Sequence, residues 1–394
     1  MADTKISDLT ALTDPATGDI LAIVDDPAGT PVTKKITVDT LAAIFNTNSL
    51  ARQAIINGNF DVWQRNVTFT NPAGAAFTAD RWKITSDAGG GSLPTNIIHT
   101  RQAITPGDLL NSFYHYRINP DGAGSSLGAS SRYYIQQYIE HGTRMLAGLS
   151  KKVTVTFWAK SSIGSKKIGA FFIQSYGTGG SPTSDEYING SYITLTSSWQ
   201  KFTVTFTLNT LAGKTFGTAN DDALILNLGV MWGSSNAAFF GGGGAETFVG
   251  SGTIDIAQVQ VCAGDIALPF QPKSFEQELQ SCQRYFEKSY KYAVFPGATI
   301  TAGNDTESIN TGTNTTSRIS FARRFRVQKR ATPTFTVYDW AGTAGKIDEL
   351  NTSDTATDNI SPSYTLGEQN GFYISHNPST KAGIAFAWTA DAEL

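Results

Sequence analysis

Apolar and polar residues alternate with a period of two over long stretches of the chain, which is typical of half-buried β-strands. In segment 152–161, four apolar side chains share one face, and Trp158 lies on the opposite face among threonines. Three more segments show the same alternation: 200–208, 223–232 and 252–261. In the last of them the alternation changes phase around Ala257, which predicts a β-bulge. Glycine-rich loops separate these segments, so we expect an antiparallel jelly-roll β-sandwich over residues 49–272.

Residues 1–48 precede this sandwich as a polar, turn-rich segment. The pattern predicts two short strands, at 20–24 and 32–38, and a short helix that begins near Thr37 or Asp39. The few apolar residues cannot bury a core by themselves. We therefore expect this segment either to stay loose or to bind a partner surface.

A helical pattern follows the sandwich at residues 273–292. Its apolar residues are spaced by three or four positions and form a narrow stripe along one side of a helix. The stripe contains Phe275, Leu279, Cys282 and Phe286. Such a stripe is typical of a helix with few neighbours or of one that packs against copies of itself. The sequence leaves both alternatives open: a seam between subunits, or a helix lying against its own sandwich.

Residues 293–394 form a second β-rich block, for which we expect a C-terminal β-sandwich domain. One of its predicted strands has apolar residues on one face, and Arg324 and Arg326 on the opposite face. Such an arginine face can bind phosphate or carboxylate groups. Its alternatives are a solvated face, a face paired with acids of another subunit, and a protected sheet edge. The segments 371–378 and 382–390 are expected to pair as a closing hairpin.

Composition and charge narrow the classes of function. The chain has 394 residues, a net charge of −3 and 16% charged residues, so no overall attraction to nucleic acid is expected. No stretch reaches the roughly 18 apolar residues of a membrane-spanning helix. The first residues lack the basic and apolar regions of a secretory signal. We therefore expect a protein that is synthesised in the cytoplasm and does not insert into a membrane.

Motifs of catalysis are missing from the sequence. The four histidines are scattered, and there is no HExxH, GxSxG, CxxC or P-loop pattern. Adjacent carboxylates such as Asp185 and Glu186 lie in predicted loops, whereas a glycosidase needs two carboxyl groups that face one cleft. The expectation is a protein without enzymatic activity.

Exposed aromatic side chains are the candidates for sugar binding. Pyranose rings stack their apolar CH face on aromatic rings, while polar neighbours bind the hydroxyl groups. Trp158 lies on the polar face of its strand, Tyr176 lies beside a glycine-rich loop, and Trp232 precedes a polar turn. Each has a structural alternative, because Trp158 can face the interior of the sandwich and Trp232 shares its phase with apolar residues.

Several motifs resemble one family of proteins. The stretches "INGNFDVWQRN" at 56–66 and "FTADRWKI" at 77–84 resemble an element of tail-fibre and related structural proteins of tailed bacteriophages. Other stretches look like the attachment segment, the following helix and the C-terminal domain of those proteins, and like the strands of carbohydrate-binding jelly rolls. They lie at 6–44, 146–162, 194–208, 252–261, 275–290 and 326–347. The resemblance touches most of the chain.

The resemblance implies a virion structural protein on the tail or capsid surface. Its implied partners are further copies of itself in a homotrimer, another virion protein at the N-terminus, and host-surface polysaccharide or lipopolysaccharide. The rival interpretations are a purely structural fibre and a glycan-binding module of a glycan-degrading particle. No cofactor is implied. Because related jelly rolls often hold a structural calcium ion, Asn59, Asp61 and Asp255 are its candidate ligands.

Overall fold

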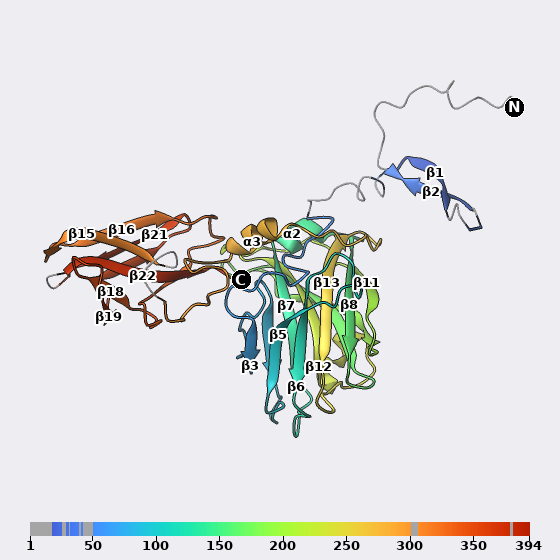
Figure 1. Cartoon of the computed structure of the whole chain (residues 1–394). Coiled ribbons are helices and arrows are strands. Elements are labelled where there is room, and N and C mark those ends of the chain that lie inside the picture. Colours follow the sequence, from blue (N-terminus) through green and yellow to red (C-terminus); the bar gives the residue numbers. More distant parts are fainter. Residues whose placement is uncertain are drawn as a thin grey trace.

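The computed structural model describes residues 18–25, 29–30, 32–38, 41, 50–300, 306–378 and 381–394. These residues form a mainly β protein built from antiparallel sheets with few helices, which confirms the expected fold class. Figure 1 shows a β-sandwich with a second β domain beside it and the C-terminus at their junction. Within the described ranges, no helix is both long and apolar enough to span a membrane.

The N-terminal part forms a β-hairpin. Strands β1 (Ile20–Asp25) and β2 (Val32–Thr37) pair antiparallel, close to the positions that the sequence predicts. Apolar side chains of both strands are exposed, including Ile20 at 60% and Val32 at 50%. A two-stranded hairpin alone is marginally stable in water. The short helix expected after β2 lies largely outside the described residues.

Two sheets form the sandwich. Their strands are β3 (Thr68–Thr70), β4 (Lys83–Asp87), β5 (Ile97–Ala103), β6 (Tyr114–Pro120), β7 (Arg132–Glu140), β8 (Lys152–Ser161), β9 (Lys167–Ser175), β10 (Glu186–Thr194), β11 (Gln200–Thr207), β12 (Ala223–Trp232) and β13 (Ile254–Ala263). The five-stranded sheet has the order β10-β9-β12-β7-β4, and the six-stranded sheet has the order β11-β8-β13-β6-β5-β3. The chain crosses repeatedly from one sheet to the other, which is the connectivity of a jelly roll. Two short helices belong to this domain: α2 (Gly142–Leu146) and the 3-10 helix η2 (Ser234–Phe240).

The core lies between the inner faces of the two sheets. In β8, Val153, Val155, Phe157 and Ala159 are at most 1% exposed, as the alternation predicts. Each valine or phenylalanine buried in this way contributes about 1.5–3 kcal/mol. The predicted bulge is also confirmed, because the pairing of β13 with β8 shifts register between Ala257 and the residues that follow it.

The helical pattern after the sandwich is only partly helical. Helix α3 spans Phe275–Gln283 and begins with a capping box, in which the side chains of Ser274 and Gln277 each accept the backbone N–H of the other. The helix predicted from the sequence is too long. Phe286–Lys288 form strand β14 instead, because they pair with the last strand, β22 (Lys381–Asp391).

The apolar stripe predicted as a subunit seam packs largely against its own chain. Cys282 and Phe286 are 0% and 4% exposed, and the guanidinium of Arg65 lies 3.8 Å from the ring centroid of Phe286. Leu279 is partly buried, and Phe275 is 41% exposed. The prediction of a subunit seam is therefore wrong for Cys282 and Phe286, because other residues of the same chain already bury these two side chains. The homotrimer itself stays a prediction.

The C-terminal domain is a second sandwich. Its strands are β14, β15 (Glu307–Thr315), β16 (Ile319–Arg324), β17 (Thr334–Tyr338), β18 (Ile347–Leu350), β19 (Ala356–Ile360), β20 (Tyr364–Gly367), β21 (Gly371–His376) and β22. Strand β22 pairs with β14, β15, β17 and β18, while β16, β21 and β20 form a separate three-stranded sheet. The predicted hairpin of β21 and β22 is wrong, because the two strands lie in different sheets on opposite sides of an apolar core.

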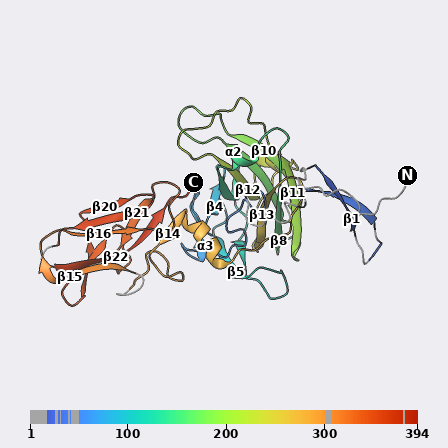
Figure 2. The ribbon, with the colours of Figure 1, turned by 90° about the horizontal axis from the view of Figure 1, so that it is seen from above.

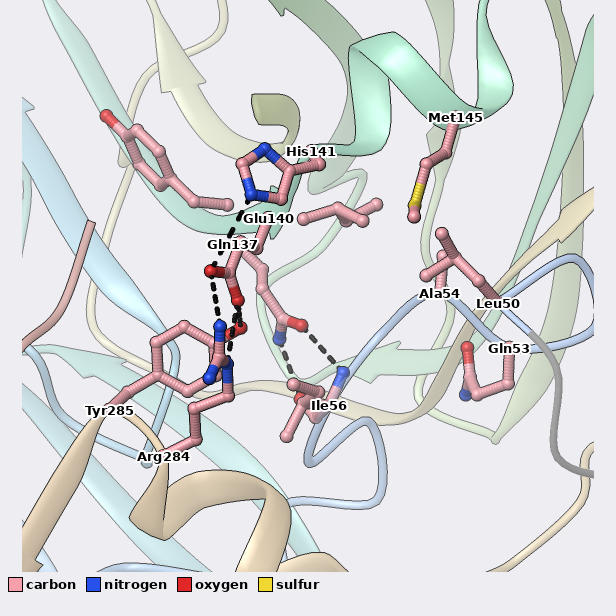
Figure 3. A pocket seen from close by; sticks show the side chains of 12 residues that line it. Leu50, Gln53, Ala54, Ile56, Gln137, Glu140, His141, Met145, Arg284 and Tyr285 are labelled. Atoms are coloured by element: carbon pink, nitrogen blue, oxygen red, sulfur yellow. Dashed lines mark hydrogen bonds and ion pairs between the residues drawn. The ribbon is translucent and has the colours of Figure 1, made fainter. Parts of the chain in front are cut away.

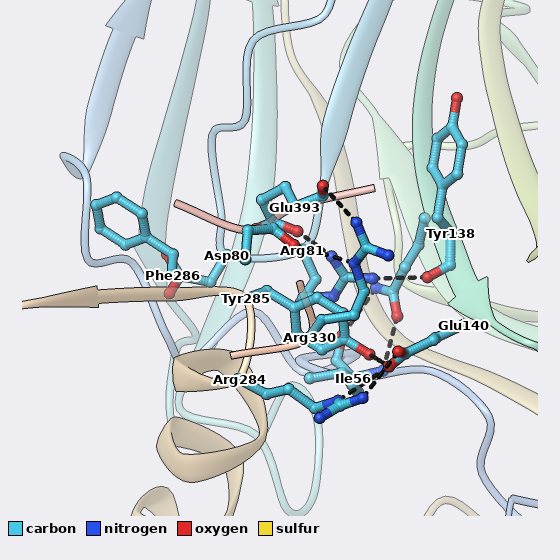
Figure 4. A network of polar contacts seen from close by, with 12 residues as sticks. Ile56, Asp80, Arg81, Tyr138, Glu140, Arg284, Tyr285, Phe286, Arg330 and Glu393 are labelled. Atoms are coloured by element: carbon cyan, nitrogen blue, oxygen red, sulfur yellow. Dashed lines mark hydrogen bonds and ion pairs between the residues drawn. The ribbon is translucent and has the colours of Figure 1, made fainter. Parts of the chain in front are cut away.

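Charged residues join the two sandwiches at the C-terminus of the chain (Figure 4). Arg81 donates to the carboxylate of Glu393 and to the carbonyl of Tyr138 (2.7 Å), and Arg65 donates to Asp391 (2.9 Å). Figure 2 shows α3 between the two domains when they are seen from above. The last strand and its end therefore hold the C-terminal domain against the side of the jelly roll.

Candidate functional site

Trp158 lies where the alternation predicts, on the outer face of the six-stranded sheet. It faces Lys201 of β11 on one side and Ala257 of β13 on the other. Ala257 is buried and belongs to the apolar cluster that Trp158 packs against. Trp158 is partly buried and packs against Ile104 and Leu109. Its ring is therefore fixed in position and still reaches the surface.

Trp158 lines a cavity of about 340 Å³. That volume suits one or two sugar rings, since small-molecule sites commonly measure roughly 300–1,000 Å³. The cavity is lined by Gly107, Asp108, Leu109, Leu110, Asn111, Trp158, Lys201, Gln258, Pro269 and Phe270. These residues come from one loop, three strands and the segment after β13. An aromatic surface thus lies beside ammonium, amide and carboxylate groups in one recess.

The bulge in β13 brings Gln258 into this cavity. Gln258 has a positive φ of 51°, which turns the backbone out of the regular ladder. Its amide Nε2 donates to the carbonyl of Leu110 (2.6 Å) and to the hydroxyl of Ser112 (2.8 Å). Among the described residues, no group donates a hydrogen bond to its amide oxygen. This oxygen is available to accept a hydrogen bond from a ligand hydroxyl.

The loop between β5 and β6 forms one wall of the cavity. Its ends are tied by the Ile104 N–H, which donates to the carbonyl of Phe113 (2.9 Å). Leu109 is buried beneath the loop, whereas Leu110 and Phe113 are 81% and 77% exposed. Leu110 lines the recess and Phe113 belongs to the same loop, so exposed apolar side chains mark this loop as a surface suited to contact a ligand.

A charged cluster lies next to this surface on the same face of the sheet. Arg117 donates to both carboxylate oxygens of Asp255 (2.7 and 2.8 Å), and a ring nitrogen of His115 lies 3.5 Å from Asp255. Burial raises the pKa of the Asp255 carboxyl, but the hydrogen bonds and charges of Arg117 and His115 together outweigh burial and lower this pKa. Trp199 covers His115 edge-on, with ring centroids 5.3 Å apart. Within the cluster, Arg117 and Asp255 satisfy each other, and the pair lies beside the cavity.

The structure corrects two of the three predicted aromatic residues. Tyr176 is fully buried, and its hydroxyl donates to the Glu186 carboxylate (2.6 Å). Trp232 is 1% exposed, and its ring stacks on Phe240 of η2 with centroids 4.1 Å apart. A register shift between Gly229 and the following residues turns Trp232 to the outer side of β12, where η2 covers it. Neither side chain is accessible to a sugar.

The structure contains a second aromatic surface, which the sequence analysis does not predict. On the outer face of the five-stranded sheet, the rings of Tyr187 and Phe239 stack with centroids 4.8 Å apart, and Phe239 stacks on Phe171 at 5.1 Å. Tyr187 is 52% exposed. The signal was weak, because Phe239 belongs to an irregular segment whose position no alternation predicts. The surface is a stack of three rings beside η2, of which Tyr187 is the most exposed.

Another cavity, of about 410 Å³, lies at the end of the sandwich beside α2 and α3 (Figure 3). Its polar groups bind one another. The Glu140 carboxylate accepts hydrogen bonds from Arg284 (3.0 and 2.8 Å) and Tyr285 (2.7 Å). The Gln137 amide accepts from the N–H of Ile56 and donates to its carbonyl. These groups are engaged in the junction between the domains, so we assign no ligand to this cavity.

The candidate calcium ligands do not form one site. Asn59 donates to the carboxylate of Asp61 (3.0 Å), whereas both oxygens of Asp255 are bound by Arg117. In the parts of the chain that the structure describes, no group of three His, Cys, Asp or Glu side chains is placed to hold a metal ion. The three predicted residues therefore do not fit a shared calcium ion, which needs six to eight oxygen ligands.

The two predicted anion-binding arginines lie in the C-terminal domain. Arg324 ends β16, Arg326 follows it, and both side chains are exposed. Both lie in the C-terminal domain, Arg324 in the three-stranded sheet and Arg326 in the segment after it, whereas the cavity at Trp158 belongs to the jelly roll. The structure thus divides the predicted site residues between two domains.

Comparison with known proteins gives only distant likenesses. No protein family matches this sequence, and no curated protein is similar to it in sequence. Among solved structures, the enzymatically active domain of tailspike protein 4 from Bacteriophage CBA120 overlaps 54% of this chain and 21% of its own, with 12% identity and a TM-score of 0.30. The chain thus spans about a fifth of the length of that tailspike structure.

Carbohydrate-binding modules are the other similar structures. The CBM22-2 xylan-binding domain from Paenibacillus barcinonensis is 15% identical, with a TM-score of 0.28, over 50% of this chain and 98% of its own. The family 11 carbohydrate-binding module from Clostridium thermocellum is 13% identical, with a TM-score of 0.27, over 50% and 96%. At this level of similarity, no ligand or activity is transferred from these proteins to the present chain.

Proposed function

We propose that this protein binds a glycan through the cavity at Trp158. The observation that carries the proposal is a partly exposed indole, fixed by packing, in a recess of about 340 Å³ that also contains Lys201, Gln258 and Asn111. The CH face of a pyranose ring would stack on the indole, because both surfaces are apolar and flat. The ring hydroxyls would bind the amide oxygen of Gln258 and the side chains of Lys201 and Asn111.

Binding at this cavity is proposed to be non-catalytic. Asp108 is the one carboxylate among the residues that line the cavity. Hydrolysis of a glycosidic bond by the usual mechanism requires a pair of carboxyl groups about 5–9.5 Å apart. The lining therefore provides the groups for recognition but not the acid and base pair for cleavage.

The wider role that we propose is attachment of a phage particle to a host-surface polysaccharide or lipopolysaccharide. The motifs at 56–66 and 77–84 support it through their resemblance to phage fibre proteins. The exposed apolar side chains of the β1–β2 hairpin support an N-terminal segment that binds another virion protein. In a homotrimer, three weak sites would reinforce one another through their high effective concentration.

The test is glycan binding by the purified protein, measured on a glycan array and then by isothermal titration calorimetry with the best ligand. Trp158→Ala should weaken binding at least tenfold, which corresponds to about 1.4 kcal/mol. The matched control is Tyr187→Ala, which removes an exposed aromatic ring from the other sheet. Unchanged binding by the Trp158 variant, with loss in the Tyr187 variant, would move the site to the second aromatic surface.

Binding to intact cells tests the wider role. Saturable binding that is lost after periodate treatment of the cell-surface sugars would support attachment to a host glycan. If the protein bound no cell that its parent particle infects, a purely structural fibre would be the better interpretation.

A further inference from the structure

The outer face of the three-stranded sheet in the C-terminal domain carries a second recess, of about 350 Å³. The pairing register places Arg324 of β16 directly opposite Gly371 of β21. On the other side of Gly371, the N–H of Glu368 donates to the Gly371 carbonyl (2.8 Å). A cation and a carboxylate therefore flank one glycine on the surface of the sheet.

The floor of this recess is bare backbone. A Cβ atom on Gly371 would lie 2.3 Å from the carbonyl oxygen of Arg323, so a side chain does not fit there without movement of the backbone. Ala322, two residues before Arg324 on β16, also contributes only a methyl group. Larger side chains, among them Arg324 and Tyr373, line the recess around these two small residues.

An aromatic ring forms the wall of the recess. Tyr373 lies between Ala322 of β16 and Leu366 of β20 in the pairing register. Its hydroxyl forms a hydrogen bond with the Ser320 hydroxyl (2.9 Å), and the ring of Tyr364 lies 6.0 Å away. These contacts hold the tyrosine ring in place, so a flat apolar surface borders the glycine.

The positive charge at this recess is not neutralised from within the described part of the chain. Arg323 pairs with Glu307 on the inner side of the same strand. Arg324 is exposed, and no side chain among the described residues forms an ion pair or hydrogen bond with its guanidinium. A free guanidinium fork matches the geometry of a carboxylate or a phosphate group.

We propose that this recess binds a pyranose that carries an anionic group. The anionic group would contact Arg324, the CH face of the ring would stack on Tyr373, and ring hydroxyls would donate to Glu368. An unmodified neutral sugar would leave the arginine without a counter-charge. This site is separate from the cavity at Trp158, and it adds a charged class of ligand that the sandwich site does not require.

The test is titration of the full-length protein with each of three sugars: methyl glucuronide, glucose 6-phosphate and methyl glucoside. Calorimetry or ligand-observed NMR measures the binding. The first two ligands distinguish a carboxylate from a phosphate as the anionic group. We expect at least one of the anionic sugars to bind tenfold more tightly than methyl glucoside, with an affinity that falls as the salt concentration rises.

Variants assign this binding to the recess. Arg324→Gln should weaken the anionic sugar at least tenfold, and Tyr373→Ala should weaken it as well. Arg132→Gln, a change of a half-exposed arginine on the jelly roll, is the matched control and should leave the affinity unchanged. Loss of binding in Trp158→Ala together with unchanged binding in Arg324→Gln would overturn this second site and support the first. Equal affinity for neutral and anionic sugars would also overturn it.

Discussion

The guanidinium of Arg284 donates two hydrogen bonds to the carboxylate of Glu140, of 3.0 and 2.8 Å. Arg284 caps helix α3, and Glu140 ends strand β7, so the pair joins the linking helix to the jelly roll. The hydroxyl of Tyr285 donates to the same carboxylate (2.7 Å). Although burial alone would raise the pKa of Glu140, these hydrogen bonds outweigh it and lower the pKa. This contact is one of several that join the jelly roll to the residues after it.

Removal of the Glu140 charge should loosen the domain junction. Glu140→Gln loses the charge-assisted hydrogen bonds and should lower the free energy of unfolding by about 1–2 kcal/mol, because the Arg284 side chain is partly exposed and solvent screens part of the loss. Urea denaturation measures this change, and small-angle X-ray scattering shows whether the domains separate. Asp87→Asn breaks an exposed ion pair with Arg132 and should change the free energy by less than about 0.5 kcal/mol. Equal effects of the two variants would contradict a structural role for Glu140.

The apolar stripe that runs from α3 into β14 should stabilise the monomer rather than a subunit seam. Phe286→Ala removes a ring that is 4% exposed and should lower the free energy of unfolding by about 3–5 kcal/mol. Phe275→Ala, in which the ring is 41% exposed, is the matched control and should cost much less. Denaturation together with light scattering measures stability and mass. A variant at Phe286 that dissociates an oligomer without loss of monomer stability would restore the seam interpretation.

The stability of the protein should depend on the protonation of Asp61. Burial raises the pKa of Asp61 to about 6, and the hydrogen bond from Asn59 opposes this only in part. Because the folded-state pKa is above the value of 3.8 for the unfolded chain, protonation favours the folded state. This contribution to stability is complete below about pH 3.8 and is lost as the pH rises through 6.

Asp61→Asn should therefore stabilise the protein relative to the wild type increasingly between pH 4 and pH 7, by at most about 3 kcal/mol. The amide still accepts a hydrogen bond from Asn59, so the local contact is kept. Thermal denaturation over this pH range measures the difference between the two proteins. Asp185→Asn, at an exposed carboxylate, serves as the control. A pH-independent difference at Asp61 would contradict the raised pKa.

Replacement of Gln258 by alanine and by glycine should give proteins of different stability, because of the backbone conformation at this position. Its positive φ of 51° costs an alanine about 1 kcal/mol but costs a glycine almost nothing. Both Gln258→Ala and Gln258→Gly lose the hydrogen bonds to Leu110 and Ser112, so hydrogen exchange in the loop before β6 should accelerate in both. Glutamine already bears this backbone cost, so alanine keeps it and glycine relieves it, and the glycine variant should be about 1 kcal/mol more stable than the alanine variant in denaturation. Equal stability of the two variants would show that the bulge relaxes.

The local pattern of apolar and polar residues predicts much of the fold. The period of two in β8 predicts which side chains are buried, because adjacent residues of a strand point to opposite faces wherever the strand lies. The phase change at Ala257 predicts the bulge for the same reason. The position of Trp158 on the outer face follows directly from this alternation. The other two aromatic candidates failed, since Tyr176 lies in a loop and a second bulge moves Trp232.

The sequence by itself determined the β class, the inner faces of the strands and the capped start of α3, because each depends on residues close together in the chain. Only the tertiary structure decided that β21 and β22 lie in different sheets and that Phe286 leaves the helix to pair with β22. It also assembled the cavity at Trp158 from segments more than 150 residues apart. Strand pairing and cavities depend on long-range contacts between surfaces, and no local period encodes which surfaces will meet.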